Sequence, residues 1–419
     1  MDTLLRSFSM HTKHLFILVS SFALVLAAIF YLLYPFASFT PSVAFPLRLS
    51  TDSIRFSSNS SLNLPSSSMS WIDKKMATMS IEDKVAQLFV IDLYTVNQTS
   101  NVVNVRPNIE AFMNQHPVGG VILFGDNVDM ADQTKKLISD LQSNASIPLF
   151  ISIDEEGGLV SRIGSKNIGV NHLPNAATLQ SDYTSSQVEE MARTLGQQLA
   201  SFGINMNFAP VLDVNTNPNN PVIGTRAFSS DPTLVGEYGT AFMHGLLGGN
   251  ILPVGKHFPG HGDTTTDSHL ERTSIDQTLD ELRRVEWLPF QQAIDAGIPV
   301  IMTGHIHTPN ITQDDLPASL SKAMTTDYLR GELGFDGVVV TDSLRMNAIA
   351  NEYDASEVGI LVLEAGGDLI LLPDDFQSCY EGIINALDSG RLTEERIDRS
   401  LRRLLALKNT FMETAHPED

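Results

Sequence analysis

The stretch 254-VGKHFPGHGDTTTDSHLE-271 determines how the fold and the chemistry of this chain are interpreted. It begins at the end of an apolar run, residues 251–254, which is typical of a buried strand, and turns through Gly and Pro into a polar segment. Burying three His and two Asp without partners would be costly, so we expect this segment to be exposed or to line a cleft. Asp267 and His269, one residue apart, can form a carboxylate–imidazole pair there.

Similar apolar runs recur on both sides of this stretch, each followed by a segment of helical length. The eight runs are residues 87–93, 119–124, 149–154, 205–214, 251–257, 299–305, 337–342 and 368–372. Buried strands that alternate with helices predict an α/β fold with a parallel sheet, and eight of them predict a closed (β/α)8 TIM barrel. A doubly wound open sheet is the alternative.

The positions of the polar residues favour the barrel. Five titratable residues stand at or near the carboxyl ends of predicted strands: Asp154, Asp213, His257, His305 and Asp342. In a barrel these ends converge on one mouth, where active sites are built.

The last predicted helix covers residues 393–408. Thr393 can cap it, and Glu394 and Glu395 suit its first turn. An apolar stripe at near-helical spacing follows: Ile397, Leu401, Leu404, Leu405 and Leu407. Because few residues remain after it, residues 71–419 are predicted to form one catalytic domain.

The N-terminal part of the chain predicts a membrane anchor. Residues 14–36 contain an almost unbroken apolar run, about as long as a bilayer core requires. Arg6 and Lys13 precede it, so residues 1–13 are expected in the cytosol and the rest of the chain on the other side of the membrane. Residues 37–70 are rich in Ser and Pro, as in a flexible stalk.

A cleaved signal peptide is the alternative for this segment, because Ser42-Val43-Ala44 offers small residues for cleavage. The domain would then be secreted, whereas the signal anchor makes it lumenal or extracellular. In either case four Asn-X-Ser/Thr tripeptides would be glycosylation acceptors, which predicts a glycoprotein. They begin at Asn59, Asn97, Asn144 and Asn310.

Composition excludes several classes of function. The formal net charge is −22 and the sequence pI is about 4.8, which argue against a nucleic-acid surface. The single Cys379 excludes an internal disulfide framework and a zinc site with several Cys ligands. His305 and His307 form an isolated H-x-H pair, a weak metal signal, so we expect no metal and no cofactor.

The central stretch resembles the signature of glycoside hydrolase family 3, in particular its single-domain β-N-acetylglucosaminidases, also called β-hexosaminidases. The resemblance rests on residues 256–263, followed by Asp267-Ser268-His269. Further motifs occur in the family's order from Trp71 to the C-terminus: 154-DEEGG-158 with Arg162, 208-FAPVLDV-214, 217-NPNNPVIGTRAF-228 and 340-VTDSLRM-346.

The resemblance implies a retaining, exo-acting β-N-acetylglucosaminidase that works through a covalent glycosyl-enzyme. It implies that Asp342 is the nucleophile and that His269, paired with Asp267, is the general acid/base. It also implies the residues that hold the sugar in the −1 subsite, which are Asp154, Arg162, Arg226, Lys256 and His257.

Two departures from the family pattern are visible. Glu155 stands where Gln is common, and Glu271-Arg272 replaces a run similar to Gly-Leu-Pro after the dyad. Neither is expected to enter the chemistry directly, although Arg272 can change how the loop closes or which leaving group it accepts.

Structural roles compete with the catalytic ones. Asp342 can cap a helix that begins near Ser343, and an isolated D-x-H is commonly a solvated surface pair. Lys256 and His257 are adjacent in a strand, so both can reach one sugar only if the backbone twists or bulges there.

Further roles are predicted for four other residues. His261 braces the loop, and Asp213 hydrogen-bonds the loop around Arg226. Arg162 and Arg226 donate to sugar hydroxyls or neutralise the acidic mouth.

Alternative functions remain open at this point. One is a phosphorolytic or transglycosylating β-glycosidase on the same scaffold, and another is a β-glucosidase, because no residue can be identified that recognises an acetamido group. A third is a non-catalytic, membrane-tethered barrel that binds sugar. The leading hypothesis is hydrolysis by a monomer whose partners are a carbohydrate substrate and the membrane.

Overall fold

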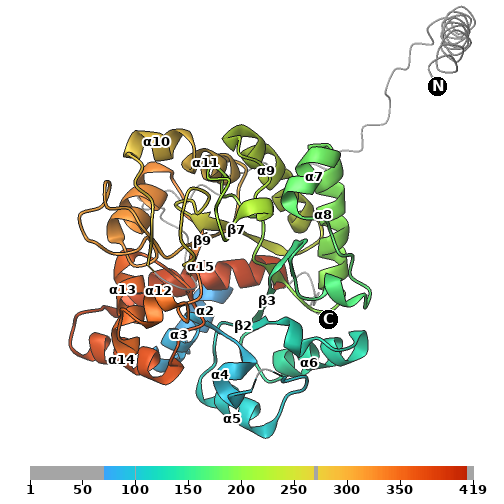
Figure 1. Cartoon of the computed structure of the whole chain (residues 1–419). Helices are drawn as coiled ribbons and strands as arrows, with labels where there is room; N and C mark the ends of the chain where they lie inside the picture. Colours follow the sequence, from blue (N-terminus) through green and yellow to red (C-terminus); the bar gives the residue numbers. More distant parts are fainter. Residues whose placement is uncertain (1–69, 100, 269–271, 413–419) are drawn as a thin grey trace, which may run out of the picture. The chain divides into compact units, whose positions relative to one another are not determined.

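Eight parallel strands form a nearly closed barrel inside a ring of helices (Figure 1). The computed structural model describes residues 70–99, 101–268 and 272–412, all within the unit Asn63–Asp419. The barrel strands are β1 (Phe89–Ile91), β2 (Gly120–Leu123), β3 (Phe150–Ile153), β6 (Met206–Asn207), β7 (Leu252–Phe258), β9 (Val300–Thr303), β11 (Val338–Thr341) and β12 (Ile370–Leu371). Seven of these strands lie within one of the eight predicted apolar runs, and β7 extends one residue beyond the run 251–257, so the strand prediction is confirmed.

The order of the strands shows that the sheet is a barrel and not an open sheet. Neighbours run β1, β2, β3, β6, β7, β9 and β11, and β12 pairs in parallel with β1. A bridge between Val340 and Leu369 joins β11 to the start of β12, and the Thr341 N–H donates to the Leu369 carbonyl at 3.1 Å. The prediction of a TIM barrel is confirmed, and the doubly wound alternative is wrong.

Helices cover the outside of the barrel. They are α2 (Trp71–Ala77), α3 (Ile81–Ala86), α4 (Leu93–Asn97), α5 (Pro107–Gln115), α6 (Ala131–Ser143), α7 (Ala176–Asp182), α8 (Ser185–Ala200), α9 (Pro232–Gly248), α10 (Leu279–Arg284), α11 (Trp287–Asp295), η4 (Ala323–Glu332), α12 (Asn347–Ala350), α13 (Ala355–Ala365), α14 (Phe376–Asp388) and α15 (Glu394–Met412). Short elements lie in the loops: β4 (Glu155–Gly157), β5 (Val160–Ser161), β8 (Thr273–Ser274), β10 (Ile306–His307), η1 (Gly125–Asn127), η2 (Gly164–Lys166) and η3 (Gly224–Arg226).

The helix predicted over residues 393–408 is α15. The Thr393 hydroxyl accepts the Arg396 N–H at 3.2 Å, as expected of a cap that satisfies a donor in the first turn. Four residues of the predicted stripe are fully buried, namely Ile397, Leu401, Leu404 and Leu405. Burying each such side chain contributes about 1.5–3 kcal/mol, which holds α15 against the barrel.

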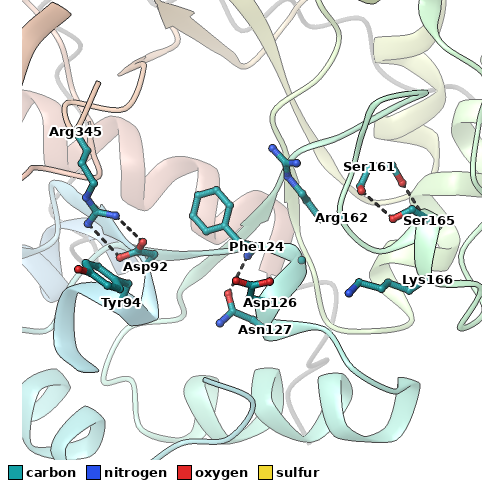
Figure 2. A pocket seen from close by; sticks show the side chains of 11 residues that line it. Asp92, Tyr94, Phe124, Asp126, Asn127, Ser161, Arg162, Ser165, Lys166 and Arg345 are labelled. Carbon is teal, nitrogen blue, oxygen red and sulfur yellow. Dashed lines mark hydrogen bonds and ion pairs between the residues drawn. The ribbon is translucent and has the colours of Figure 1, made fainter. Parts of the chain in front are cut away.

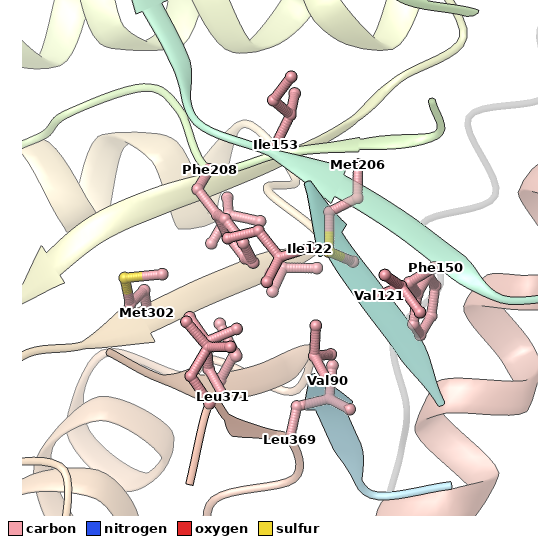
Figure 3. Packing of buried hydrophobic residues seen from close by; sticks show 14 of the residues in the cluster. Val90, Val121, Ile122, Phe150, Ile153, Met206, Phe208, Met302, Leu369 and Leu371 are labelled. Atoms are coloured by element: carbon pink, nitrogen blue, oxygen red, sulfur yellow. The ribbon is translucent and has the colours of Figure 1, made fainter. Parts of the chain in front are cut away.

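The interior of the barrel is apolar below its mouth. Ile122 from β2, Met302 from β9 and Leu371 from β12 converge on the barrel axis (Figure 3). These three side chains also line the cavity described in the next section. The core therefore serves as the floor of the functional site, and the polar residues at the strand ends form its walls.

A lysine is buried at the opposite, N-terminal end of the barrel. Lys408 of α15 is 1% exposed, and its Nζ donates to the Gln87 side chain and to the Gly119 carbonyl, both at 2.9 Å. The ammonium group also lies 4.8 Å from the centroid of the Phe150 ring. Burial lowers the pKa of Lys408 to about 7.

This lysine predicts a particular dependence of stability on pH. An unfolded Lys titrates near pH ~10.4, so between the folded pKa of about 7 and that value the unfolded state binds more protons. The free energy of unfolding should then rise with pH, by up to about 1.4 kcal/mol per pH unit. We expect wild type to gain stability relative to Lys408→Met from pH 7 to pH 10 in thermal unfolding. Equal pH dependence in the two proteins would refute this origin, and Lys136→Met is the exposed control.

Among the described parts of the chain, 70–99, 101–268 and 272–412, no helix has the length and apolar character needed to cross a bilayer. The predicted anchor at residues 14–36 lies outside the described residues, as does nearly all of the predicted stalk, 37–70. Both remain predictions.

Candidate active site

The carboxyl ends of the strands surround a cavity of about 450 Å³. Six of the residues predicted from the resemblance line this one cavity: Asp154, Arg162, Arg226, Lys256, His257 and Asp342. They come from β7 itself and from the segments that follow β3, β5, β6 and β11, so closure of the barrel brings together residues that are far apart in the sequence. The remaining two predicted residues, Asp267 and His269, lie on the segment that follows β7.

A buried ion network forms one wall of the cavity. Lys256 Nζ lies 2.9 Å from Asp154 Oδ1 and 2.6 Å from Glu156 Oε1. Arg226 grips Glu156 with two hydrogen bonds, Nε to Oε2 at 2.9 Å and Nη2 to Oε1 at 2.8 Å. Two cations thus balance two carboxylates, and such charge-assisted donors and acceptors suit the hydroxyl groups of a sugar.

The network is charged at neutral pH. Burial alone would lower the pKa of Lys256, but the neighbouring Asp154 and Glu156 carboxylates outweigh it and raise that pKa. Burial would likewise raise the pKa of Glu156, yet Lys256 and Arg226 hold it far below its usual range. Lys256 and Glu156 therefore depend on their partners to remain ionised away from water.

An irregularity in β7 explains how two adjacent residues reach one cavity. The pairing of β7 with β9 shifts register between Gly255 and Phe258, so Lys256 and His257 are not in a regular strand. β7 also contains a cis peptide bond between these two residues. The predicted departure from regular strand geometry is confirmed.

Asp213 orients His257. Its Oδ2 lies 2.7 Å from His257 Nδ1, and its Oδ1 accepts the backbone N–H groups of His257 at 3.2 Å and His261 at 2.7 Å. The prediction that Asp213 hydrogen-bonds the loop around Arg226 is wrong, because Oδ1 accepts the N–H groups of His257 and His261 and Oδ2 faces the His257 ring. A proton on Nδ1 leaves His257 Nε2 as the ring nitrogen that can accept a hydrogen bond.

His261 braces the dyad segment, as predicted. It is 2% exposed, with Nδ1 at 2.8 Å from the Thr264 hydroxyl and Nε2 at 2.9 Å from the Ser268 hydroxyl. Burial and the nearby His257 lower the pKa of His261 to about 4, so it is neutral at physiological pH. A neutral ring can donate to one hydroxyl and accept from the other.

Asp342 is not a helix cap. Its N–H donates to the Thr303 carbonyl at 2.9 Å, and its Oδ1 accepts the Ser343 N–H at 2.7 Å. The next helix, α12, begins at Asn347, with Met346 as its N-cap residue. The capping alternative is therefore wrong, and the half-buried carboxylate lines the cavity.

The segment that carries the predicted dyad is tied to the residues after Asp342. The Ala348 N–H donates to the Ser268 carbonyl at 3.4 Å, and Ser268 is also bound by His261. Asp267 is described and His269 is not. The chain is therefore anchored immediately before His269 on the segment that follows the Asp342 strand.

His305 is committed to structure. Its Nδ1 lies 2.8 Å from the Ser319 hydroxyl and its Nε2 lies 2.9 Å from the Ser343 carbonyl, which supports the backbone next to Asp342. No group of three or more His, Cys, Asp or Glu side chains could hold a metal ion within the part of the chain that the structure describes.

Glu156 is the site residue that sequence reasoning missed. Glu155 and Glu156 are adjacent in β4, so their side chains point to opposite faces. The Glu155 side chain points away from the cavity. Its Oε2 accepts the backbone N–H groups of Arg162 at 2.8 Å and Ile163 at 2.9 Å. Glu155 shapes the loop that presents Arg162, and Glu156 belongs to the ion network. Because neighbouring residues of a strand point to opposite faces, the sequence predicts that either Glu155 or Glu156 faces the site. It does not show which of the two does.

A second cavity, of about 660 Å³, adjoins the first (Figure 2). Phe124, Arg162 and Arg345 line both. Arg345 joins the segment after β11 to Asp92 after β1, with Nη1 to Oδ2 at 2.8 Å and Nη2 to Oδ1 at 3.3 Å. Sequence reasoning assigned no role to Arg345.

Comparison with known proteins identifies the family. Residues 80–407 match the family described as the glycosyl hydrolase family 3 N-terminal domain. This chain belongs to glycoside hydrolase family 3. The resemblance deduced from the motifs is confirmed, and the match spans the barrel.

Relatives of this family 3 chain are named β-hexosaminidases. It is 35% identical over 340 residues to β-hexosaminidase LpqI of Mycobacterium tuberculosis, covering 79% of this chain and 84% of that one. It is also 35% identical over 343 residues to β-hexosaminidase A of Pseudoalteromonas piscicida, covering 74% of this chain. The chain spans only about half, 56%, of that relative's length.

Solved structures agree with the family. A family 3 β-N-acetylglucosaminidase from Paenibacillus sp. FPU-7 matches with a TM-score of 0.77 and 38% identity, covering 82% of this chain and 64% of that one. The M. tuberculosis LpqI structure matches with a TM-score of 0.72 and 32% identity, covering 81% of this chain and 97% of that one.

Proposed function

We propose that this chain is a retaining β-N-acetylhexosaminidase that hydrolyses terminal β-linked N-acetylhexosamine, with Asp342 as nucleophile and His269, oriented by Asp267, as general acid/base. One observation carries the proposal. The six described residues that the family pattern assigns to the nucleophile and the sugar grip, Asp342 among them, line one cavity. The names of the relatives support hexosamine as the sugar.

The ion network provides the grip on the sugar. Asp154 and Glu156 can accept hydrogen bonds from hydroxyl groups, whereas Lys256 and Arg226 can donate to them. Because the four groups already hold one another in place, little reorganisation is required when the sugar binds. Binding energy can then be used to position the anomeric carbon over Asp342.

In the first chemical step an Asp342 oxygen attacks the anomeric carbon. A C–O bond to the carboxylate forms as the glycosidic C–O bond breaks, and His269 transfers a proton to the departing oxygen. In the second step His269 takes a proton from water, whose oxygen attacks the anomeric carbon and releases Asp342. The product keeps the β configuration because each step inverts the centre.

The position of Ser268 supports the assignment of His269. Ser268 contacts the backbone of Ala348, in the segment that begins after Asp342. A residue immediately after Ser268 can therefore lie near the nucleophile.

Removal of His269 should affect substrates according to their leaving groups. We expect His269→Ala to lower kcat/KM on an alkyl N-acetylglucosaminide by about 10²–10⁴-fold, since an alkoxide leaves poorly without a proton. A 2,4-dinitrophenyl glycoside needs no protonation, so its kcat/KM should change much less. Equal losses on the two substrates would contradict the acid role, and His172→Ala, which changes an exposed His, is the matched control.

The proposed activity is tested directly with aryl glycosides. The 4-nitrophenyl glycosides of β-N-acetylglucosamine and β-glucose should both be offered to the purified barrel. We expect turnover of the first to exceed turnover of the second, and the first product seen by proton NMR to be the β anomer. Failure to hydrolyse either glycoside would contradict the proposal, and phosphate-dependent release of a sugar phosphate would favour phosphorolysis.

A further inference from the structure

A third cavity, of about 430 Å³, is lined mainly by basic side chains, and we call it the basic cavity. Its walls come from η4, α13, α15 and the residues that flank these helices. Six cations line it, namely Lys322, Arg330, Arg391, Arg396, Arg399 and Arg403. Among the described residues of the lining, Glu364 is the one acid. Acidic residues outnumber basic ones by 49 to 27 in the whole chain, so this gathering of cations departs strongly from the composition.

The basic cavity lies at the amino ends of two barrel strands, whereas the active-site cavity lies at the carboxyl ends. Arg403 Nε donates to the carbonyl of Asp336, two residues before β11, at 3.1 Å. Asp368 stands two residues before β12, and its carboxylate lies 3.1 Å from Arg403 Nη1 and 2.6 Å from Arg330 Nη2. The two cavities share no lining residue, so the basic cavity is not part of the sugar site.

Neutral acceptors hold two of the guanidinium groups in place. Arg330 donates to the Gly366 carbonyl through Nε at 3.2 Å and through Nη2 at 3.1 Å. Arg396 donates through Nε to the Leu363 carbonyl and through Nη1 to the Ser400 hydroxyl, both at 2.7 Å. Carbonyl and hydroxyl oxygens fix the position of a guanidinium without cancelling its charge. This wall of the cavity is therefore positive and already ordered.

The ion pairs around the basic cavity leave a surplus of positive charge. Three of the cations form ion pairs with three carboxylates: Asp368 with Arg330 and Arg403, and Glu357 and Glu364 with Arg391. The other three cations, Lys322, Arg396 and Arg399, form no ion pair with an acid in the parts of the chain that the structure describes. Burial and the neighbouring guanidinium groups lower the pKa of Arg396 to about 10, although Asp368 opposes them. Six cations against three paired carboxylates leave three positive charges unmatched.

This surplus selects the chemistry of a ligand. Guanidinium groups donate in a fork that matches the oxygens of a phosphoryl group. Such a group carries about −1.5 to −2 charge at pH 7, so two linked phosphoryl groups would offset the surplus. The large apolar side chains that are exposed among the described residues, Trp71, Tyr94, Met130 and Leu159, do not line this cavity. The absence of apolar surface from the lining favours a soluble anion over a lipid.

We propose that the basic cavity is a binding site for a small soluble anion with two linked phosphoryl groups. The anion would contact Lys322 beside η4 and Arg399 of α15, and so join two helices that cover the amino ends of β11 and β12. A ligand that binds only the folded state stabilises it, so occupancy should raise the melting temperature. This inference does not depend on the reaction proposed for the mouth of the barrel.

Inorganic pyrophosphate is the probe for this site. Its binding to the purified full chain is measured by isothermal titration calorimetry and by thermal unfolding, with sodium chloride added to equalise the ionic strength of all samples. We expect pyrophosphate to bind at one site and to raise the melting temperature. Inorganic phosphate and sulfate, with one centre each, should bind at least about tenfold more weakly. Tighter binding of soluble dihexanoyl phosphatidic acid than of pyrophosphate would overturn the assignment to a soluble anion.

Two variants locate the binding. Lys322 and Arg399 are exposed and form no ion pair among the described residues, so Lys322→Ala and Arg399→Ala should fold normally. Each should lower the affinity for pyrophosphate about tenfold, and the double variant should lose the rise in melting temperature. Arg106→Ala, which removes an exposed Arg just before α5, is the matched control and should bind as wild type does.

The results separate this site from the active site. Pyrophosphate held instead by Lys256 and Arg226 at the mouth would bind the double variant as tightly as wild type, and that result would overturn the proposal. Undetectable binding of pyrophosphate to wild type would overturn it as well. Turnover of an aryl glycoside should change less than about twofold in Lys322→Ala and Arg399→Ala. Because calorimetry needs no catalysis, a failure of the proposed function would leave the binding result unaffected.

Discussion

Asp342→Asn should lower kcat on 4-nitrophenyl β-N-acetylglucosaminide by about 10⁴-fold or more, with little change in the melting temperature. The amide cannot form the glycosyl ester, so the first chemical step loses its nucleophile. Asn keeps the size of Asp and an oxygen that can accept the Ser343 N–H, which lies 2.7 Å from Oδ1 in the wild type. The assay is the steady-state release of nitrophenol, combined with thermal unfolding.

Two further variants show whether this loss reports on chemistry. Asp336→Asn changes an exposed Asp just before β11 and should retain wild-type activity. Asp342→Ala leaves space below the anomeric carbon, on the face opposite the leaving group, so added azide should restore turnover and give the α-glycosyl azide. Activity in Asp342→Asn within tenfold of wild type would exclude Asp342 as the nucleophile.

The second large effect is expected from Lys256→Met. The change keeps most of the length of the side chain and removes the ammonium group that holds Asp154 at 2.9 Å and Glu156 at 2.6 Å. Glu156 retains Arg226, but the network then carries one uncompensated negative charge. Breaking a buried pair in this way typically costs about 3–5 kcal/mol, and we expect a comparable loss in the free energy of unfolding.

The same change should also weaken binding of the sugar. We expect kcat/KM to fall by about 10²–10³-fold, because a donor to the sugar is lost and the carboxylates beside it are no longer held in place. Urea unfolding and steady-state kinetics measure the two effects on the same protein. Lys136→Met, on the surface, should change neither, and a fully stable and active Lys256→Met protein would contradict the role of the network.

Much of the fold could be predicted because the strands are short apolar runs separated by segments of helical length. Titratable residues such as Asp154 and Asp342 stand at the ends of those runs, so closing the barrel was enough to bring them together. The final helix was predictable for the same reason, since its apolar stripe and its Thr393 cap are local features.

What could not be predicted depends on geometry between elements. The register shift in β7 arises from its pairing with β9, and it decides that Lys256 and His257 share a cavity. The direction in which Asp213 points, and the choice of Glu156 over Glu155 as the partner of Arg226, depend on how loops pack over the mouth. The ion pair between Arg345 and Asp92 joins residues that are 253 positions apart, so no local sequence pattern predicts it.

The central claim is that Asp342 becomes bonded to the sugar during turnover, and covalent trapping tests it most directly. Fluorine at C5 slows both chemical steps, whereas a good leaving group such as fluoride speeds the first, so 5-fluoro-β-N-acetylglucosaminyl fluoride should accumulate the intermediate. Mass spectrometry of the intact protein and of its peptic peptides should then find one fluorosugar on Asp342. A label on any other residue, or turnover to an α product without a label, would contradict the account.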